Sequence, residues 1–151
     1  MRCFLFHLMP YASLDLDYDK EYKASWVVYP NSNFDPKVGQ YLYNTYLDEL
    51  EMGEELGFDG LCVNEHHQNA YGIMPSPIVP AAALARRTST ARIAVLGNAF
   101  GIREHPLTLA EEHAMIDCIT GGRLISGMVR GIGAEYYLSL IHISEPTRRR
   151  T

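Results

Sequence analysis

The sequence lacks the features that mark membrane-spanning, secreted and nucleic-acid-binding proteins. No apolar run approaches the ~18–20 residues of a membrane span, and the N-terminal apolar stretch ends at Pro10, too early for a secretory signal. The 151 residues carry a net charge of -5, and the one basic run, Arg148 to Arg150, lies at the far end. We therefore expect a cytoplasmic protein without a membrane or nucleic-acid partner.

Cysteine is scarce, and no motif for metal or nucleotide binding is present. Cys3, Cys62 and Cys118 form no Cys-x-x-Cys pair, and each lies in an apolar or helical stretch, so we predict reduced core residues. The six histidines show neither His-Glu-x-x-His nor His-x-His spacing. No metal site is predicted, and a metal hydrolase would require His66 and His105 to share an ion. Walker and Gly-x-Ser-x-Gly motifs are also absent.

Strand-like and helix-like segments alternate along the chain. The apolar patterns, prolines and glycines predict strands at 2–9, 58–64, 91–98 and 123–129, with helices at 37–56, 77–88 and 106–120. Residues 11–36 are polar and interrupted by proline, which favours an irregular segment. Alternation of this kind is typical of βαβ units, so we predict an α/β fold with about four parallel strands.

The long loops follow strands, whereas the tight connections follow helices. In parallel α/β folds, ligands bind at the carboxyl ends of the strands. The polar residues and glycines in these loops are therefore candidate site residues: Glu65, His66, His67, Gly97, Asn98, Arg103, His105 and Arg130.

Glu65, His66 and His67 directly follow an apolar strand. Adjacent strand residues point to opposite sides, so at most one of the two histidines faces a site at the strand ends. A histidine there suits general acid or base work, although each could instead be a buried, hydrogen-bonded side chain. Glu65 could orient an imidazole, cap a helix or pair with an arginine.

The third and fourth strands end in groups suited to a flat, phosphorylated ligand. Gly97 permits close backbone approach, and Asn98 offers a donor and an acceptor to a ring edge, although "LGNAFG" could also be a plain turn. Arg130, beside two glycines, suits a phosphate but could equally pair with a carboxylate. His113 lies mid-helix and is interpreted as a helix-surface or interface residue.

Three segments resemble the luciferase-like flavin-dependent monooxygenases, the superfamily of bacterial luciferase: "GFDGLCVNEHH", "SPIVPAAALARRTSTARIAVLGNA" and "HPLTLAEEHAMIDCITGGRLISGMVRGIGAEY". The likeness covers roughly residues 38–137. It implies a TIM barrel in which His66 is catalytic near the reactive flavin carbon. Gly97 and Asn98 match a strand end where a non-proline cis peptide abuts the flavin ring, Arg130 contacts the flavin phosphate, and Glu65 belongs to the same cofactor-binding set.

The resemblance also implies the reaction. FMN, reduced by a separate flavin reductase, would react with dioxygen to oxidise a small organic substrate, and the protein would form a homo- or heterodimer. A related branch uses a deazaflavin for hydride transfer, which we favour less. A different class remains open: a small α/β module that binds flavin or phosphate as a homodimer without turnover.

The chain departs from the family in length and in its last residues. A TIM barrel takes about 250 residues, so four strand–helix units correspond to its N-terminal half. We therefore expect a partial barrel domain at 1–137, with the first and fourth strands as open edges, and do not expect the chain as given to catalyse alone. Residues 138–151, "LSLIHISEPTRRRT", match no family element and are interpreted as an artefactual or disordered tail.

Overall fold

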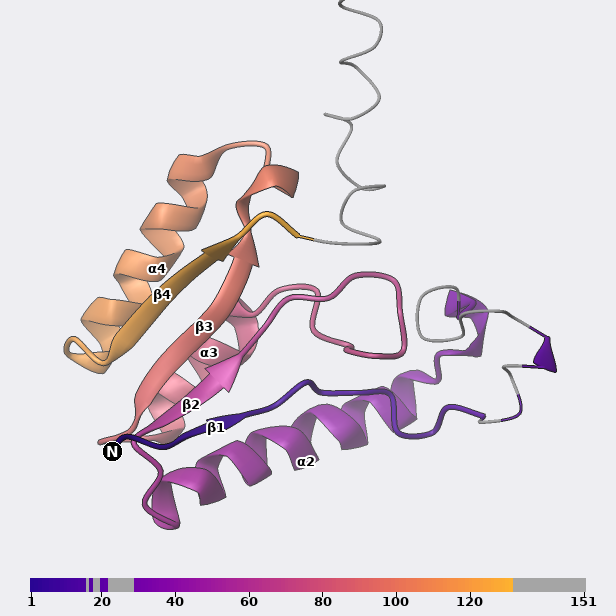
Figure 1. Cartoon of the computed structure of the whole chain (residues 1–151), viewed down its shortest axis with the longest axis horizontal. Helices are drawn as coiled ribbons and strands as arrows, with labels where there is room; N and C mark the ends of the chain where they lie inside the picture. Colours follow the sequence, from indigo (N-terminus) through magenta and orange to yellow (C-terminus); the bar gives the residue numbers. More distant parts are fainter. Residues whose placement is uncertain (16, 18–19, 22–28, 132–151) are drawn as a thin grey trace, which may run out of the picture.

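The computed structural model describes residues 1–15, 17, 20, 21 and 29–131; the tail predicted at 138–151 and the domain end predicted at 137 lie outside these residues. Strands and helices alternate in the described part (Figure 1). The strands are β1 (Phe4–Phe6), β2 (Gly60–Val63), β3 (Arg92–Ala99) and β4 (Leu124–Val129). The helices are α2 (Pro36–Glu55), α3 (Ile78–Arg87) and α4 (Pro106–Thr120), with 3-10 turns η2 (Asn31–Asn33) and η3 (Phe100–Ile102).

The four strands are parallel and follow one another in the sheet in the order β1-β2-β3-β4. Side chains from α2, α3 and α4 share one apolar core with Leu61, Val63, Ile93 and Val95 of the sheet. Helices on a single face of a sequentially ordered sheet are the winding of a TIM barrel, since a doubly wound sheet carries helices on both faces. The predicted α/β fold with part of a barrel is confirmed.

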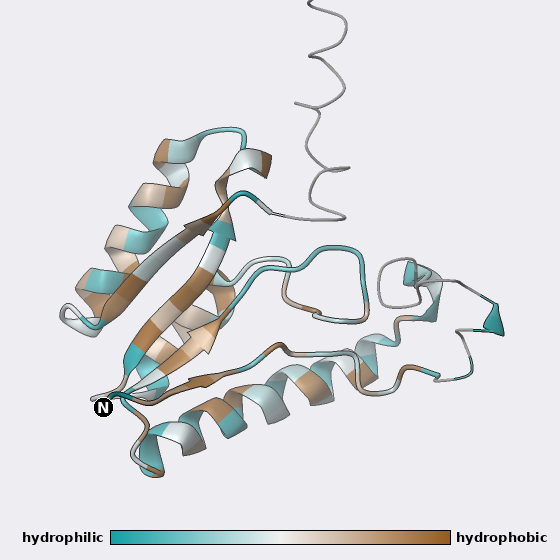
Figure 2. Ribbon diagram, viewed as in Figure 1, coloured by the Kyte–Doolittle hydropathy of each residue, from teal (hydrophilic) through white to brown (hydrophobic). Residues whose placement is uncertain are grey.

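The face of the sheet opposite the helices is less covered. Phe6 is 47% exposed and Leu96 is 49% exposed. Figure 2 shows apolar residues along much of the strands, whereas the visible surfaces of the helices are a mixture of apolar and polar residues. In the described sheet β1 and β4 are the two edges, as predicted.

The helix ends follow local sequence signals. α4 begins at Pro106 in the first turn and ends at Gly121, whose φ of 67° is left-handed, so the predicted bounds of 106–120 are matched. On α2, Asp35 accepts a hydrogen bond from the Lys37 backbone N–H as the N-cap. Among the described residues, no helix combines the length and the apolar composition that crossing a bilayer requires.

The prediction for the cysteines is correct for only one of the three. All three are free thiols, but only Cys62 is buried, whereas Cys3 and Cys118 are exposed. Cys3 precedes β1, where its backbone N–H donates to the Asp59 carboxylate. Cys118 lies on α4 only two residues after buried Ile116, so helical geometry turns it to the other side.

Candidate functional site

The carboxyl ends of β2, β3 and β4 border a hollow of about 370 Å³, here called the rim hollow. Its volume lies within the ~300–1,000 Å³ common for small-molecule sites. The structure thus brings together four of the predicted site residues from separate parts of the sequence: Glu65, His66, Gly97 and Arg130. The remaining lining residues are Asn64, Leu96, Ala99, Val129 and Gly131.

Glu65, a buried carboxylate that is 7% exposed, is one of the residues that line the rim hollow. One oxygen lies 2.7 Å from His67 Nε2. The other accepts hydrogen bonds from Asn98 Nδ2 at 2.7 Å, the Ala99 backbone N–H at 3.0 Å and Arg103 at 3.2 Å. Burial raises the pKa of Glu65, but these donors and the Arg103 charge outweigh burial and hold the pKa below its usual value. Glu65 is therefore an ionised anchor at the end of β2.

The two adjacent histidines lie in the loop after β2 and have different partners. His66 lines the rim hollow, with its Nε2 at 2.8 Å from Asn64 Nδ2 and its ring edge-on to Tyr71 at 5.0 Å. His67 instead bonds Glu65. His66 is thus the histidine that can meet a ligand in the rim hollow.

Position 97 requires glycine because of a contact between strands, which the sequence does not show. The Leu96–Gly97 peptide bond is cis and non-proline, at the strand end where the resemblance implies one. A Cβ at Gly97 would lie 2.6 Å from the Gly127 carbonyl oxygen, a distance that real Cβ atoms do not adopt. The contact with β4 therefore requires glycine here, independently of any ligand.

Asn98 faces away from the predicted position at a ligand ring. It is 0% exposed, and its amide bonds Glu65 and His113 Nε2, which lies 2.8 Å from Asn98 Oδ1 on the helical side of the sheet. The pairing of β3 with β4 shifts register between Val95 and Asn98. A bulge of this kind changes which side chains face each side of the sheet, and nothing in the sequence indicates it.

Arg130 lies at the end of β4, exposed, on the border of the rim hollow. Gly131 follows it with a φ of 85°, a conformation that glycine adopts without strain. Leu96, Ala99 and Val129 give the rim hollow an apolar surface next to this guanidinium. The combination suits a flat apolar ring that carries an anionic group.

His113 was expected to be a helix-surface or interface residue, and the structure shows the interface position. It is 5% exposed and bonds Asn98 and Ser126, two partners that the sequence did not indicate. The signal was available, because spacings of four and three residues place it on the same side of α4 as Leu109 and Ile116. A polar residue within that apolar stripe indicates a buried partner.

Metal binding has no support in the part of the chain that the structure describes. No group of three or more His, Cys, Asp or Glu side chains lies close enough there to hold an ion. His105, one half of the metal alternative, is exposed immediately before α4 and does not line the rim hollow.

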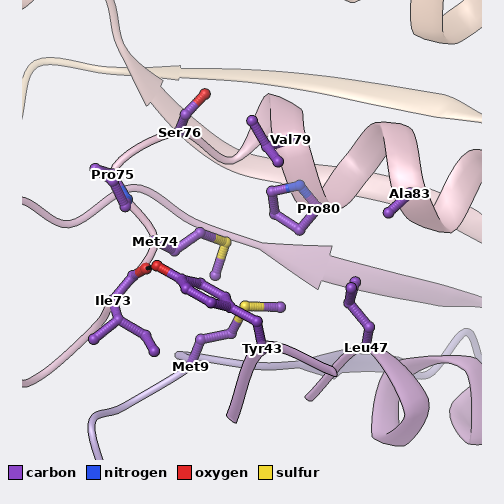
Figure 3. A pocket seen from close by; sticks show the side chains of 10 residues that line it. All are labelled: Met9, Tyr43, Leu47, Ile73, Met74, Pro75, Ser76, Val79, Pro80 and Ala83. Carbon is purple, nitrogen blue, oxygen red and sulfur yellow. Dashed lines mark hydrogen bonds between the residues drawn. The ribbon is translucent and has the colours of Figure 1, made fainter. Parts of the chain in front are cut away.

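A second cavity, of about 250 Å³, lies between α2 and α3 (Figure 3). Its wall is apolar, with Met9, Leu47, Met74 and Val79 among its lining residues. The Tyr43 hydroxyl donates to the Ile73 carbonyl at one side of it, so that group is already bonded. The rim hollow, with Glu65, His66 and Arg130, is the better candidate for chemistry.

Comparisons with known proteins agree with this architecture. Residues 28–140 match the family described as luciferase-like monooxygenase. The oxygenase component of flavin-dependent trigonelline monooxygenase from Acinetobacter baylyi is 32% identical over 107 residues, which are 71% of this chain and 29% of that protein. The alkanal monooxygenase beta chain of Vibrio harveyi is 32% identical over 81 residues, 54% of this chain and 25% of that protein.

Solved structures show the same fold. Monooxygenase RslO1 from Streptomyces bottropensis superposes with a TM-score of 0.70 at 28% identity, covering 99% of this chain and 39% of that one. The oxygenating constituent of 3,6-diketocamphane monooxygenase from Pseudomonas putida, in complex with FMN, gives 0.68 at 18% identity, covering 91% and 32%. The chain thus spans less than a third of the curated relatives named above. With the family matched over most of its length, the chain belongs to the luciferase-like monooxygenases.

Proposed function

We propose that the protein acts as a flavin-dependent monooxygenase whose rim hollow binds FMN. The observation that carries the proposal is the convergence of three strand ends around one hollow, which His66, Gly97 and Arg130 all line. The relative from Acinetobacter baylyi is named as flavin-dependent, and the Pseudomonas putida structure contains FMN, which supports a flavin and FMN in particular over a deazaflavin.

The lining residues fit the two halves of FMN. Leu96, Ala99 and Val129 offer apolar surface to the ring system, and Arg130 offers a guanidinium to the phosphate. FMN, once bound and reduced, supplies the chemistry that activates dioxygen, which side chains alone cannot perform. The exposed apolar surface of Leu96 and Val129 is available to pack against the ring.

The remaining polar groups have distinct tasks in this proposal. His66, held by Asn64 and packed against Tyr71, presents an imidazole that can hold or donate a proton next to the ring. Glu65 fixes the end of β2 to Ala99 of β3 and so keeps the two walls of the rim hollow together. His66 is the catalytic residue, whereas Glu65, Gly97 and Asn98 shape the cofactor site.

We further propose a two-component system. The Acinetobacter baylyi relative is named as an oxygenase component, which supports a separate reductase as the source of reduced flavin. The alkanal monooxygenase relatives are named as alpha and beta chains, which supports a dimeric assembly. The substrate in this proposal is a small organic molecule.

Binding of FMN and of riboflavin, which lacks the phosphate, tests the site. Arg130→Ala is expected to weaken FMN binding by about tenfold to a hundredfold, as for the loss of one charge-assisted hydrogen bond, and to leave riboflavin binding unchanged. Dissociation constants from quenching of flavin fluorescence provide the measurement.

Arg92→Ala is the matched control, because Arg92 is an exposed arginine at the opposite end of the sheet. It changes the net charge by the same amount and should leave FMN binding unaltered. Equal losses for both variants, or equal losses of FMN and riboflavin binding in Arg130→Ala, would contradict the phosphate contact. Tighter binding of a deazaflavin than of FMN would reassign the cofactor.

A further inference from the structure

A line of hydrogen bonds runs from exposed Ser126 on β4 through the buried residues His113, Asn98 and Glu65 to the rim hollow. Ser126 Oγ lies 2.7 Å from His113 Nδ1, and His113 Nε2 lies 2.8 Å from Asn98 Oδ1. Asn98 Nδ2 then donates to Glu65 Oε2 at 2.7 Å. His113, Asn98 and Glu65 are 5%, 0% and 7% exposed, so water has little access to these three residues. The line begins on the helical side of the sheet and ends at the rim hollow.

The chemistry of the groups fixes the direction of every bond in this line. An ionised carboxylate only accepts, so Asn98 must turn its NH2 group to Glu65 and its carbonyl oxygen to His113. His113 Nε2 must therefore carry a hydrogen. In the neutral ring, Nδ1 is then an acceptor, and the Ser126 hydroxyl donates to it. Burial lowers the pKa of His113 while the nearby Glu112 charge raises it, with burial the larger effect, which favours this neutral form.

Asn98 depends on His113 for its orientation. The amide has a donor end and an acceptor end, and Glu65 needs the donor. Without a donor at position 113, the Asn98 carbonyl would be buried and unpaired. A rotated amide would then place that carbonyl against the Glu65 carboxylate, where two acceptors repel.

We propose that His113 is a positioning residue for the rim hollow: by donating from Nε2 to Asn98, it fixes the amide that donates to Glu65 and holds that carboxylate in place. The proposal rests on the proposed function in so far as the rim hollow is the flavin site. His113 itself touches neither the rim hollow nor a ligand. Its effect passes through Asn98 to Glu65, which joins β2 to β3 beside His66.

Two substitutions at position 113 separate positioning from packing. In His113→Gln the amide nitrogen can reach the position of Nε2 and donate to Asn98, whereas His113→Leu fills similar space without a donor. His105→Leu is the control, since it removes an exposed histidine next to the same helix. We expect Glu65 to titrate at a higher pH in His113→Leu and near its wild-type pH in His113→Gln, followed by carboxyl 13C NMR.

FMN affinity provides the second readout. We expect His113→Leu to bind FMN about tenfold more weakly, as for one lost hydrogen bond in the line, with His113→Gln restoring most of the affinity. Unchanged Glu65 titration in His113→Leu, or equal Glu65 titration and equal FMN affinity in the Gln and Leu variants, would overturn the proposal.

The wild-type protein tests the proposal without any variant or ligand. Ring 15N shifts of His113 at neutral pH should report a neutral imidazole with hydrogen on Nε2. A neutral ring with its hydrogen on Nδ1 would overturn the proposal even where His113→Leu fails to fold. Absence of FMN binding by the wild-type chain would instead remove the proposed function, while the ring shifts and the Glu65 titration would still decide the role of His113.

Discussion

Each end of the sheet contains one carboxylate with several hydrogen-bond donors, but the donors differ. At the amino end, Glu54 accepts from the backbone N–H groups of Ser89, Thr90 and Ala91 and from the Ser89 hydroxyl. At the carboxyl end, three of the four donors to Glu65 are side chains. A carboxylate with a lowered pKa is therefore not by itself the mark of a functional site.

The connections explain the difference. The turn from α3 to β3, residues 88–91, is short, and Glu54 satisfies its exposed backbone donors much as a helix cap does. The loop from β2 to α3, residues 64–77, is long and supplies side chains that border the rim hollow. The carboxylate at the amino end stabilises a turn, whereas the one at the carboxyl end organises a candidate site.

The largest effect is expected from Glu65→Gln. The change keeps the shape of the side chain but removes its charge, so Arg103 and His67 have a weaker partner. The new NH2 group of glutamine would also face a hydrogen-bond donor inside the protein. We expect a loss of about 3 kcal/mol in the free energy of unfolding, as for a broken buried charge pair, together with weaker FMN binding. Urea unfolding and flavin titration at pH 7 measure the two effects.

Glu104→Gln is the control for the charge, since Glu104 is exposed on the loop after β3. Glu104→Gln should change neither the free energy of unfolding nor the affinity for FMN. Similar losses in Glu65→Gln and Glu104→Gln would remove the distinction between the buried anchor and an ordinary surface carboxylate.

A smaller effect, restricted to stability, is expected from Glu54→Gln. Burial raises the pKa of Glu54, but the four donors outweigh it and lower the pKa from 4.5 to about 2. Because the folded pKa is below the unfolded one, the stabilisation is present above pH 4.5 and is lost as the pH falls toward 2. We expect Glu54→Gln to cost about 1 kcal/mol at pH 7 and to leave FMN binding intact.

The pH dependence sharpens this test. The difference in unfolding free energy between wild type and Glu54→Gln should narrow steadily between pH 4.5 and pH 2. A difference that stays constant on acidification, or a Glu54→Gln variant with impaired FMN binding, would contradict a role confined to the turn.

Much of the fold could be predicted from the sequence because local signals agree with the tertiary structure. α4 was bounded correctly since Pro106 and Gly121 mark its two ends. The meeting of Glu65, His66, Gly97 and Arg130 followed from parallel strands whose carboxyl ends lie at one edge. The helix ends are encoded within one segment, and the meeting of the strand ends follows from the alternation of strands and helices.

The roles that were missed depend on register and on contacts between elements. Asn98 faces α4 because of an irregularity in the pairing of β3 with β4, which no pattern within β3 encodes. His113 acquires its partner only once α4 packs on that strand. Cys3 is exposed because β1 begins after it, at Phe4, two positions later than the predicted start at residue 2.

Amide chemical-shift mapping of the 15N-labelled chain during titration with FMN shows which end of the sheet binds the cofactor. We expect saturable shifts of the amides at the carboxyl ends of the strands, namely Glu65, His66, Gly97, Ala99 and Arg130. The amides at the amino end, namely Glu54, Ser89, Thr90 and Ala91, should keep constant shifts. Saturable shifts centred on the amino-end turn or on the cavity between α2 and α3, with the amides of the rim hollow unchanged, would contradict it.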